Sequence, residues 1–274
     1  MHKEENKIIY SPSDLTLYMD SPFASWMEHK AIINPELLTH ADPMDEMMIL
    51  LQSKGAAYEG EVLELFLEKN LNVAQIKRGK TAEDNTYTAM QDGVDVIYQA
   101  ALSVPPFKGY ADFLIKVEGQ SGLGDYCYEV WDTKLSKTLR PYVAIQLCCY
   151  AEMLEMLQGR RPEYIVAALG SGERERLRTD DYFYYYQNLK SQFLKMHRPS
   201  SKQVDINPAD SSNWGRWSDH AKKLLKEADH LSQIATITKS QIKKLEKAGI
   251  GTMQKMADTD SSFIKGIDSK ILSR

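Results

Sequence analysis

The sequence has few of the features that mark secreted or membrane-spanning proteins. It holds only three cysteines among 274 residues, Cys127, Cys148 and Cys149. An odd number without zinc-finger spacing argues against a disulfide framework and favours a reducing compartment. No run of about 18 apolar residues occurs, and the apolar stretch near the N-terminus is too short for a signal peptide. We therefore expect a cytoplasmic protein that makes no membrane contact.

The sequence also lacks an excess of positive charge. It has 34 Lys and Arg against 38 Asp and Glu, a net charge of −4. This excludes a strongly basic, histone-like binder but leaves room for a local basic groove. Residues 201–274 hold 13 basic and 9 acidic side chains, whereas residues 1–200 are net acidic. The C-terminal quarter is the better candidate for a phosphate-facing surface, although a solvated lysine-rich helix face gives the same counts.

Hydrophobic patterning predicts a mixed α/β core followed by helices. Apolar residues at helical spacing alternate with short β-rich runs, and a glycine-rich turn at 118–124 predicts a hairpin. Such an order is typical of a sheet flanked by helices. The expected strands are 94–98, 110–117, 126–134 and 164–169, and the expected helices are 12–30 (interrupted near Ser21-Pro22), 43–70, 141–157, 181–196 and several from 219 onward.

Two acidic residues and a lysine lie on the predicted hairpin. Asp112 falls within the first strand, and Asp132 and Lys134 share one face of the second because side chains alternate along a strand. Two carboxylates suit Mg²⁺ or Mn²⁺, and a lysine can offset charge that develops on phosphorus. A solvated ion pair is the alternative, but the neighbouring apolar residues predict a buried sheet, where unpaired charges are costly.

The next predicted helix adds a polar pair. Gln146 and Tyr150 stand four residues apart and so share a helix face. The amide of Gln146 can hydrogen-bond a phosphate or a water, and Tyr150 can stack on a base or support the site. Ordinary helix amphipathicity explains such a pair equally well when it is taken alone.

The joint order of these residues resembles one nuclease branch. Gly109-x-x-Asp112, Asp132-x-Lys134 and Gln146-x-x-x-Tyr150 are similar to the motifs of RecB-like nucleases of the PD-(D/E)XK superfamily, over residues 8–260. The resemblance implies a restriction-endonuclease-like α/β core, with a mixed sheet flanked by helices, at 1–200 and a helical extension at 201–274. It also implies that Asp112 and Asp132 bind Mg²⁺ or Mn²⁺, assisted by the backbone carbonyl of Thr133.

The same resemblance implies a third acidic ligand on the helix at 43–70. Glu59 matches an acidic position that follows a histidine in many relatives, and the histidine position here is Tyr58. Glu61 and Glu64 compete with Glu59, because one sequence does not fix the phase of the helix. Glu129 is a secondary candidate with a structural role.

Several relatives bind an iron–sulfur cluster, and this sequence lacks the matching thiols. Ser21 stands where relatives carry a cysteine before proline, and residues 212–217 replace a C-x-x-C pair. Serine is not an iron–sulfur ligand, so we expect no cluster and predict that the three cysteines pack in the core. Trp26, Trp214 and Trp217 are candidates to fill the space instead.

The C-terminal segment resembles a helix-hairpin-helix element. A basic helix at 238–248 precedes Gly249-Ile-Gly251 and a further short helix. Such hairpins offer amides to a DNA phosphate, although an ordinary turn between helices gives the same pattern. Relatives of this layout usually carry a further, often RNase H-like, domain, so we expect a truncated or stand-alone version that acts alone or with a protein partner.

These expectations favour a metal-dependent nuclease that hydrolyses phosphodiester bonds, with DNA as the first candidate substrate. Asp112, Asp132, Lys134, Gln146 and Tyr150 are the expected catalytic residues. DNA repair is one of several pathways that fit. The alternative is a catalytically weak or inactive nuclease-fold module that binds nucleic acid or a protein partner.

Overall fold

The computed structural model describes residues 1–198 and 205–259. These residues form two compact units. The first holds residues 1–19 and 44–198, and the second holds residues 20–43 and 205–259. A single boundary near residue 200 would assign residues 20–43 to the sheet-containing unit. These residues group with the C-terminal helices instead.

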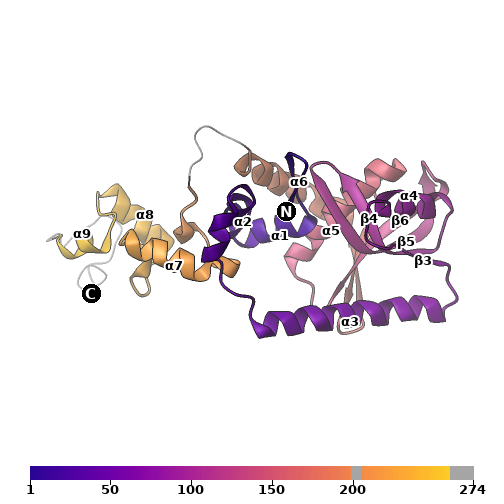
Figure 1. Cartoon of the computed structure of the whole chain (residues 1–274), viewed down its shortest axis with the longest axis horizontal. Coiled ribbons are helices and arrows are strands. Elements are labelled where there is room, and N and C mark those ends of the chain that lie inside the picture. Colours follow the sequence, from indigo (N-terminus) through magenta and orange to yellow (C-terminus); the bar gives the residue numbers. More distant parts are fainter. Residues whose placement is uncertain (199–204, 260–274) are drawn as a thin grey trace. The chain divides into compact units, whose positions relative to one another are not determined.

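A six-stranded mixed sheet is the centre of the first unit (Figure 1). Its spatial order follows the sequence order, and β4, β5 and β6 form an antiparallel meander. The outer pairings β3–β4 and β6–β7 are parallel, and β8 closes the other edge antiparallel to β7. The strands are β3 (Val73–Gln75), β4 (Val96–Val104), β5 (Phe107–Ser121), β6 (Gly124–Lys134), β7 (Tyr164–Leu169) and β8 (Arg174–Arg178).

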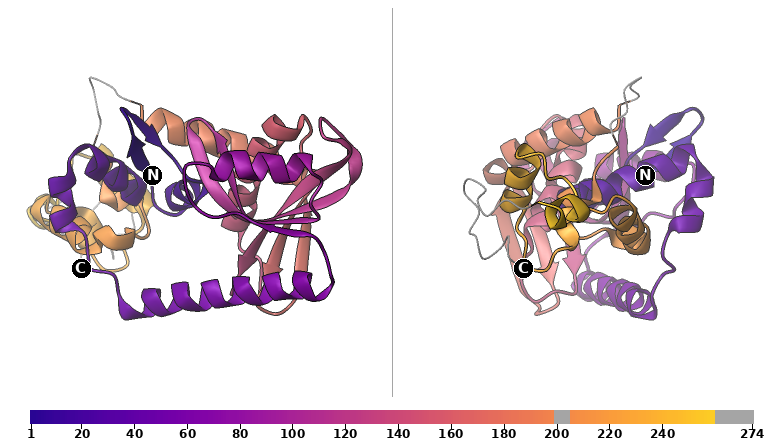
Figure 2. Two further views of the ribbon diagram at one scale, coloured as in Figure 1. Left: turned by 45° about the vertical axis from the view of Figure 1, so that its right-hand side comes forward. Right: turned by 90° about the vertical axis from the view of Figure 1, so that its left-hand side faces the viewer.

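Helices cover both faces of this sheet. Helix α5 (Pro141–Gln158) packs on the central strands, and α6 (Thr179–Met196) packs on α5. On the opposite face, Val62, Leu63 and Phe66 of α3 (Glu46–Glu68) pack against β4, β5 and β6. The left view of Figure 2 shows α3 running along this side of the sheet. The remaining elements of the unit are β1 (His2–Glu4), β2 (Lys7–Ile9), α1 (Pro12–Asp20) and α4 (Ala82–Gln91).

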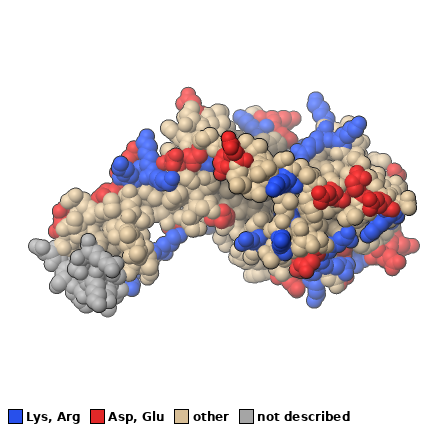
Figure 3. All heavy atoms as spheres, turned by 90° about the horizontal axis from the view of Figure 1, so that it is seen from below, with Lys and Arg blue, Asp and Glu red and all other residues tan. Residues whose placement is uncertain are grey.

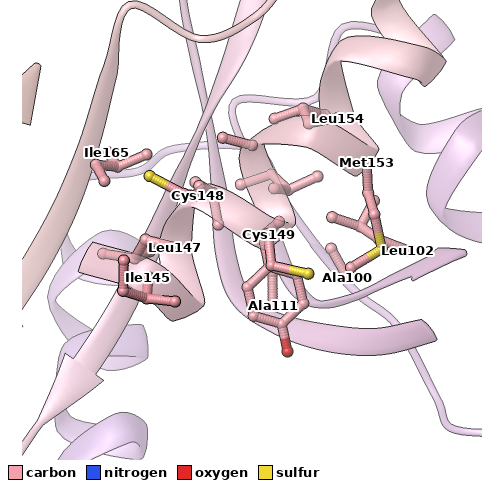
Figure 4. Close-up of a cluster of buried hydrophobic side chains, with 14 of the residues drawn as sticks. Ala100, Leu102, Ala111, Ile145, Leu147, Cys148, Cys149, Met153, Leu154 and Ile165 are labelled. Atoms are coloured by element: carbon pink, nitrogen blue, oxygen red, sulfur yellow. The ribbon is translucent and has the colours of Figure 1, made fainter. Parts of the chain in front are cut away.

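The main core lies between α5 and the sheet. Pro141 begins α5, as proline suits a first helical position, and Gly159 ends it in a left-handed conformation with φ of 70°. Between these ends the helix is buried on most sides. Figure 4 shows the adjacent Cys148 and Cys149 side chains pointing in different directions into this core. All three cysteines are buried and free, and Cys148 and Cys149 pack in the main core, as predicted.

The sheet is distorted where Asp112 lies. Tyr98 and Ala100 pair with Phe113 and Ala111, so Gln99 lies opposite Asp112. Gln99 has a φ of 54°, a backbone conformation that residues other than glycine rarely adopt. Val96 and Tyr98 pack on the α3 side of the sheet, and strict alternation would place Ala100 there too, but Ala100 packs in the core on the α5 side. The left-handed residue therefore shifts the alternation of β4 next to Asp112.

The second unit is helical. It consists of α2 (Pro22–Ile33), α7 (Ser218–Glu227), α8 (Lys239–Lys247), α9 (Met253–Ala257) and the 3₁₀ turns η1 (Pro35–His40), η2 (Pro208–Asp210), η3 (Gly215–Trp217) and η4 (Leu231–Gln233). Glu28 of α2 accepts hydrogen bonds from Arg216 at 2.7 Å and from the indole of Trp217 at 2.9 Å. These contacts explain why α2 joins the C-terminal part of the chain.

The structure confirms an α/β protein with a mixed sheet flanked by helices and a helical C-terminal region. The part of the expected extension at 260–274 lies outside the described residues. None of the helices in the described ranges combines the length and the hydrophobicity that a membrane crossing requires.

Candidate active site

Strand β6 presents the predicted aspartate and lysine toward α5. Val130 on the same strand belongs to the α5 core, and alternation places Asp132 and Lys134 on that same face. The Lys134 ammonium lies 2.5 Å from Asp132 Oδ2 and also donates to the amide oxygen of Gln146 at 3.2 Å. The amide nitrogen of Gln146 donates to Asp132 Oδ1 at 3.0 Å. The helix residue therefore fixes both members of the ion pair.

Asp112 links β5 to β6 through its side chain. The β5–β6 ladder continues to the pair Phe113 and Trp131, one step short of Asp112. Beyond it, Asp112 Oδ2 accepts hydrogen bonds from the backbone amide of Thr133 at 2.7 Å and from its hydroxyl at 2.8 Å. The carboxylate thus takes the place of a backbone partner and is held next to Asp132. The role predicted for the Thr133 carbonyl stays a prediction, because the observed contacts use its amide and hydroxyl.

Tyr150 supports this arrangement from the core. Its side chain is buried, and its hydroxyl donates to the Tyr110 carbonyl at 2.7 Å. Burial, followed by the charges of Asp132 and Asp112, raises the pKa of Tyr150 well above its usual range, so the hydroxyl stays neutral. A Cβ at Gly109 would lie 2.9 Å from this hydroxyl, so a side chain at this position of the motif would collide with Tyr150. Tyr150 in this position braces β5 and is not exposed for stacking on a base.

Helix α3 brings Glu59 to the same region. The side-chain amide of Gln99 donates to Glu59, and the Tyr98 hydroxyl also hydrogen-bonds to it. Of the three glutamates left open by the sequence, Glu59 is the one with a hydrogen bond to the sheet, whereas Glu61 and Glu64 are exposed. The neighbouring Tyr58 donates to the Leu169 carbonyl at the end of β7. The Tyr58 hydroxyl is thus bound to the backbone, at the position that the resemblance to RecB-like nucleases compares with a histidine.

The acidic site comprises five residues: Glu59, Asp112, Asp132, Lys134 and Gln146. Its electrostatics are unfavourable to negative charge. Burial, and then the charge of Asp112, raises the pKa of Asp132 from 3.8 to about 7 against the opposing effect of Lys134. The same two causes raise the pKa of Glu59. Burial alone would lower the pKa of Lys134, but the pair with Asp132 outweighs it and raises that pKa.

The acidic site retains two oxygens for a cation. Asp112 Oδ1 accepts no hydrogen bond from the described residues, and the buried Asp132 Oδ2 has the Lys134 ammonium as its sole polar partner among them. Within the described ranges no three acidic, histidine or cysteine side chains are arranged to hold a metal ion together. Mg²⁺ is often bound by one or two carboxylates, with waters and substrate phosphates filling the other positions. The two aspartates therefore fit a hard divalent cation.

Glu129 lies outside the acidic site. It is buried on the opposite face of β6, and Arg176 donates to it at 2.9 Å. This ion pair fits the structural role that the sequence suggested.

Comparisons with known proteins add no relative. No protein-family model matches the chain, and no curated protein matches its sequence. The functional interpretation therefore depends on the geometry of the acidic site and on the motif order.

The positions compared with an iron–sulfur cluster do meet in the second unit. The Ser21 hydroxyl donates to the Asn213 carbonyl at 2.7 Å, and the Phe23 amide donates to Ser211 at 3.2 Å. These hydroxyls and amides do not fit an iron–sulfur cluster, which needs thiolates. Trp26 and Trp217 are buried in this unit, while the indole of Trp214 donates to the Pro208 carbonyl.

In the helix-hairpin-helix-like element, the first backbone amides of α9 already have hydrogen-bond acceptors. Gly249 adopts a φ of 83° between α8 and α9. Asp229 accepts from the amides of Met253 and Gln254, and Thr252 accepts from the amide of Lys255. The first amides of α9 are thus satisfied within the described chain. This occupancy weighs against a phosphate at the start of α9.

Sequence reasoning missed three residues at this site. Gln99 and Tyr98 hold Glu59, and Arg78 donates from Nη2 to the Gln99 amide oxygen at 3.2 Å. The Lys77-Arg78-Gly79-Lys80 cluster was the available signal, but a short basic loop without a strand pattern looks like ordinary surface.

Proposed function

We propose that the chain is a metal-dependent nuclease that hydrolyses phosphodiester bonds, with DNA as the preferred candidate substrate. One observation carries the proposal: the side chains of Asp112, Asp132, Lys134 and Gln146 come from three elements and meet where the β5–β6 ladder ends, on the side that faces α5. The motif order resembles that of RecB-like nucleases, and the observed contacts link the motifs in a way that this resemblance expects.

The two aspartates would hold Mg²⁺ or Mn²⁺. Such an ion polarises the phosphodiester and lowers the pKa of a bound water. Asp112 is fixed for this by Thr133, and Asp132 is fixed by Gln146. Even with Lys134 beside it, Asp132 has a pKa of about 7 because of burial and Asp112, so a further positive charge would favour its ionised form.

Lys134 has the charge and the position to act on the substrate. Its ammonium carries three donors, and the observed contacts use Asp132 and Gln146. A remaining donor can orient the attacking water or stabilise charge on a phosphate oxygen. Gln146 keeps the ammonium in place and does not need to touch the substrate.

Cleavage assays with matched variants test the proposal. End-labelled single-stranded DNA, duplex DNA and RNA are incubated with Mg²⁺, Mn²⁺ or EDTA and with wild type, Lys134→Ala or Lys116→Ala. Lys116 is the control because it also pairs with an aspartate, Asp95, at 2.8 Å, but outside the acidic site. We expect metal-dependent cleavage that falls at least about a hundredfold in Lys134→Ala and persists in Lys116→Ala. Equal cleavage by all three proteins would refute the assignment.

A binding module without catalysis is the second candidate. It is favoured by Tyr58, whose hydroxyl is bound to the Leu169 carbonyl at a position where relatives carry a metal-binding histidine. This alternative predicts nucleic-acid binding by folded wild type with no cleavage under any metal, so the same assay separates the two.

A further inference from the structure

Arg78 lies beside the acidic site on a loop that the proposed chemistry does not use. The loop follows β3 and contains Lys77, Arg78 and Lys80. Arg78 is joined to the sheet through Gln99, the residue that lies opposite Asp112 and that also holds Glu59. Its guanidinium carbon is 4.7 Å from the centre of the Tyr110 ring. Both contacts place the cation next to the distorted part of β4 and β5.

The Arg78 guanidinium has N–H donors that no described residue uses. Its Nη2 donates to Gln99, and it forms no ion pair with any described residue. A guanidinium has five N–H donors in a planar fork, which leaves four for a ligand. Lys77 and Lys80 are likewise exposed and make no ion pair among the described residues. The loop therefore presents three positive charges that the protein does not neutralise.

A fixed cation beside the acidic site would help to hold the substrate backbone. Three of the five residues of the site are acidic, the proposed Mg²⁺ or Mn²⁺ ion would act on the reacting phosphate, and Lys134 is engaged with Asp132. Arg78 already acts on this field, because its charge partly opposes the rise in the pKa of Glu59 that burial and Asp112 cause. Figure 3 shows Lys and Arg interspersed with Asp and Glu on the face it displays, so that face carries no broad positive field. Attraction of a phosphate next to the reacting bond would then depend on a local cation such as Arg78.

The guanidinium is also held in a defined orientation. Stacking on an aromatic ring and one hydrogen bond restrict a side chain that would otherwise sample many rotamers. A planar fork fixed in this way suits bidentate contact with phosphate oxygens better than a flexible ammonium does.

We propose that Arg78 binds a backbone phosphate of the nucleic acid, adjacent to the bond that the acidic site acts on, with Lys77 and Lys80 adding non-specific attraction. The inference rests on the proposed function. Its ligand is the phosphodiester backbone of DNA or RNA, and it requires no base-specific contact.

The salt dependence of binding tests this role. Affinity for labelled single-stranded DNA, duplex DNA and RNA is measured in EDTA, where metal-dependent cleavage cannot occur, at several salt concentrations. Each phosphate neutralised contributes about 0.7 to 0.9 to the slope of log affinity against log salt. We expect Arg78→Ala to lower the slope by about one for the preferred nucleic acid and to weaken binding equally for unrelated sequences. Arg78→Lys keeps the charge and should keep the slope while binding more weakly than wild type.

Arg160→Ala is the matched control, because Arg160 also donates to a single protein oxygen, the Gln120 carbonyl, at 3.0 Å near the β5–β6 turn. It should leave the slope unchanged. If folded Arg78→Ala binds with the wild-type slope, Arg78 only braces Gln99 and the inference is wrong. If wild type binds none of the three nucleic acids, both the proposed function and this inference are wrong. If wild type cleaves nucleic acid but Arg78→Ala keeps the wild-type slope, only the inference is wrong.

Discussion

The burial of Asp132 has a measurable effect on stability. Its pKa rises from 3.8 to about 7 in the folded chain, because burial and Asp112 disfavour the charged form. The native state then binds the proton more tightly than the unfolded chain does. The contribution of Asp132 to the free energy of unfolding is therefore expected to fall as pH rises from about 4 to 7 and to stay level above that range. At 1.36 kcal/mol per pH unit, the loss from this group amounts to about 4 kcal/mol.

Asp132→Asn removes this titration and keeps the shape of the side chain. Other groups titrate in the same range, so the useful quantity is the difference in unfolding free energy between variant and wild type. We expect this difference to increase by about 4 kcal/mol in favour of the variant between pH 4 and pH 8. In wild type, Lys134 does not contribute to the change, because its raised pKa keeps it charged throughout this range.

Urea unfolding in EDTA at several pH values measures the difference. Asp95→Asn is the control: a hydrogen bond from Lys116 lowers the pKa of Asp95, so its contribution is lost only as pH falls below the ordinary value, and no increase is expected between pH 4 and 8. A difference for Asp132→Asn that stays constant with pH would refute the reasoning. Added Mg²⁺ or Mn²⁺ should stabilise wild type, by about 2.7 kcal/mol at a hundred times its dissociation constant, and should stabilise Asp132→Asn far less.

Three further substitutions test the packing around the site and the second unit. Gly109→Ala places a Cβ 2.9 Å from the Tyr150 hydroxyl. We expect cleavage to fall at least about tenfold, which corresponds to an increase of about 1.4 kcal/mol or more in the barrier, while the far-UV circular dichroism spectrum is retained. Unchanged cleavage would show that Tyr150 can move freely. Gly170→Ala brings a Cβ to 2.3 Å from the Leu135 carbonyl oxygen, which should lower stability by about 1 to 3 kcal/mol in denaturant unfolding. Thr238→Ala removes the capping box of α8 and should cost about 1 kcal/mol, seen as faster hydrogen exchange in α8, whereas unchanged exchange would contradict the cap.

Long, strongly patterned elements could be predicted from the sequence. The strand at 164–169 and the helix at 141–157 agree with β7 and α5, and the 110–117 and 126–134 strands form the expected hairpin, which is longer than predicted. Each of these segments buries a large apolar surface against the sheet, so its period is visible in the residues themselves.

Several elements were missed because their residues show little apolar pattern. Strand β3 has three residues, and β8 is an exposed edge strand that carries arginine at every second position. Charged residues are usual on edge strands, where they block further pairing. Helix α4 has few large apolar residues and is held by packing on β4.

The sequence by itself determined the main strands and helices, the burial of the cysteines, and the spacing that places Asp132 and Lys134 on one face. These follow from short-range periodicity, which every residue carries locally. Only the tertiary structure decided that Asp112 binds the backbone amide of Thr133, that Gln99 adopts a left-handed conformation and joins Glu59 to Arg78, and that residues 20–43 belong with the C-terminal helices. Those features depend on contacts between residues that are far apart in the chain, and a single sequence contains no local signal for such contacts.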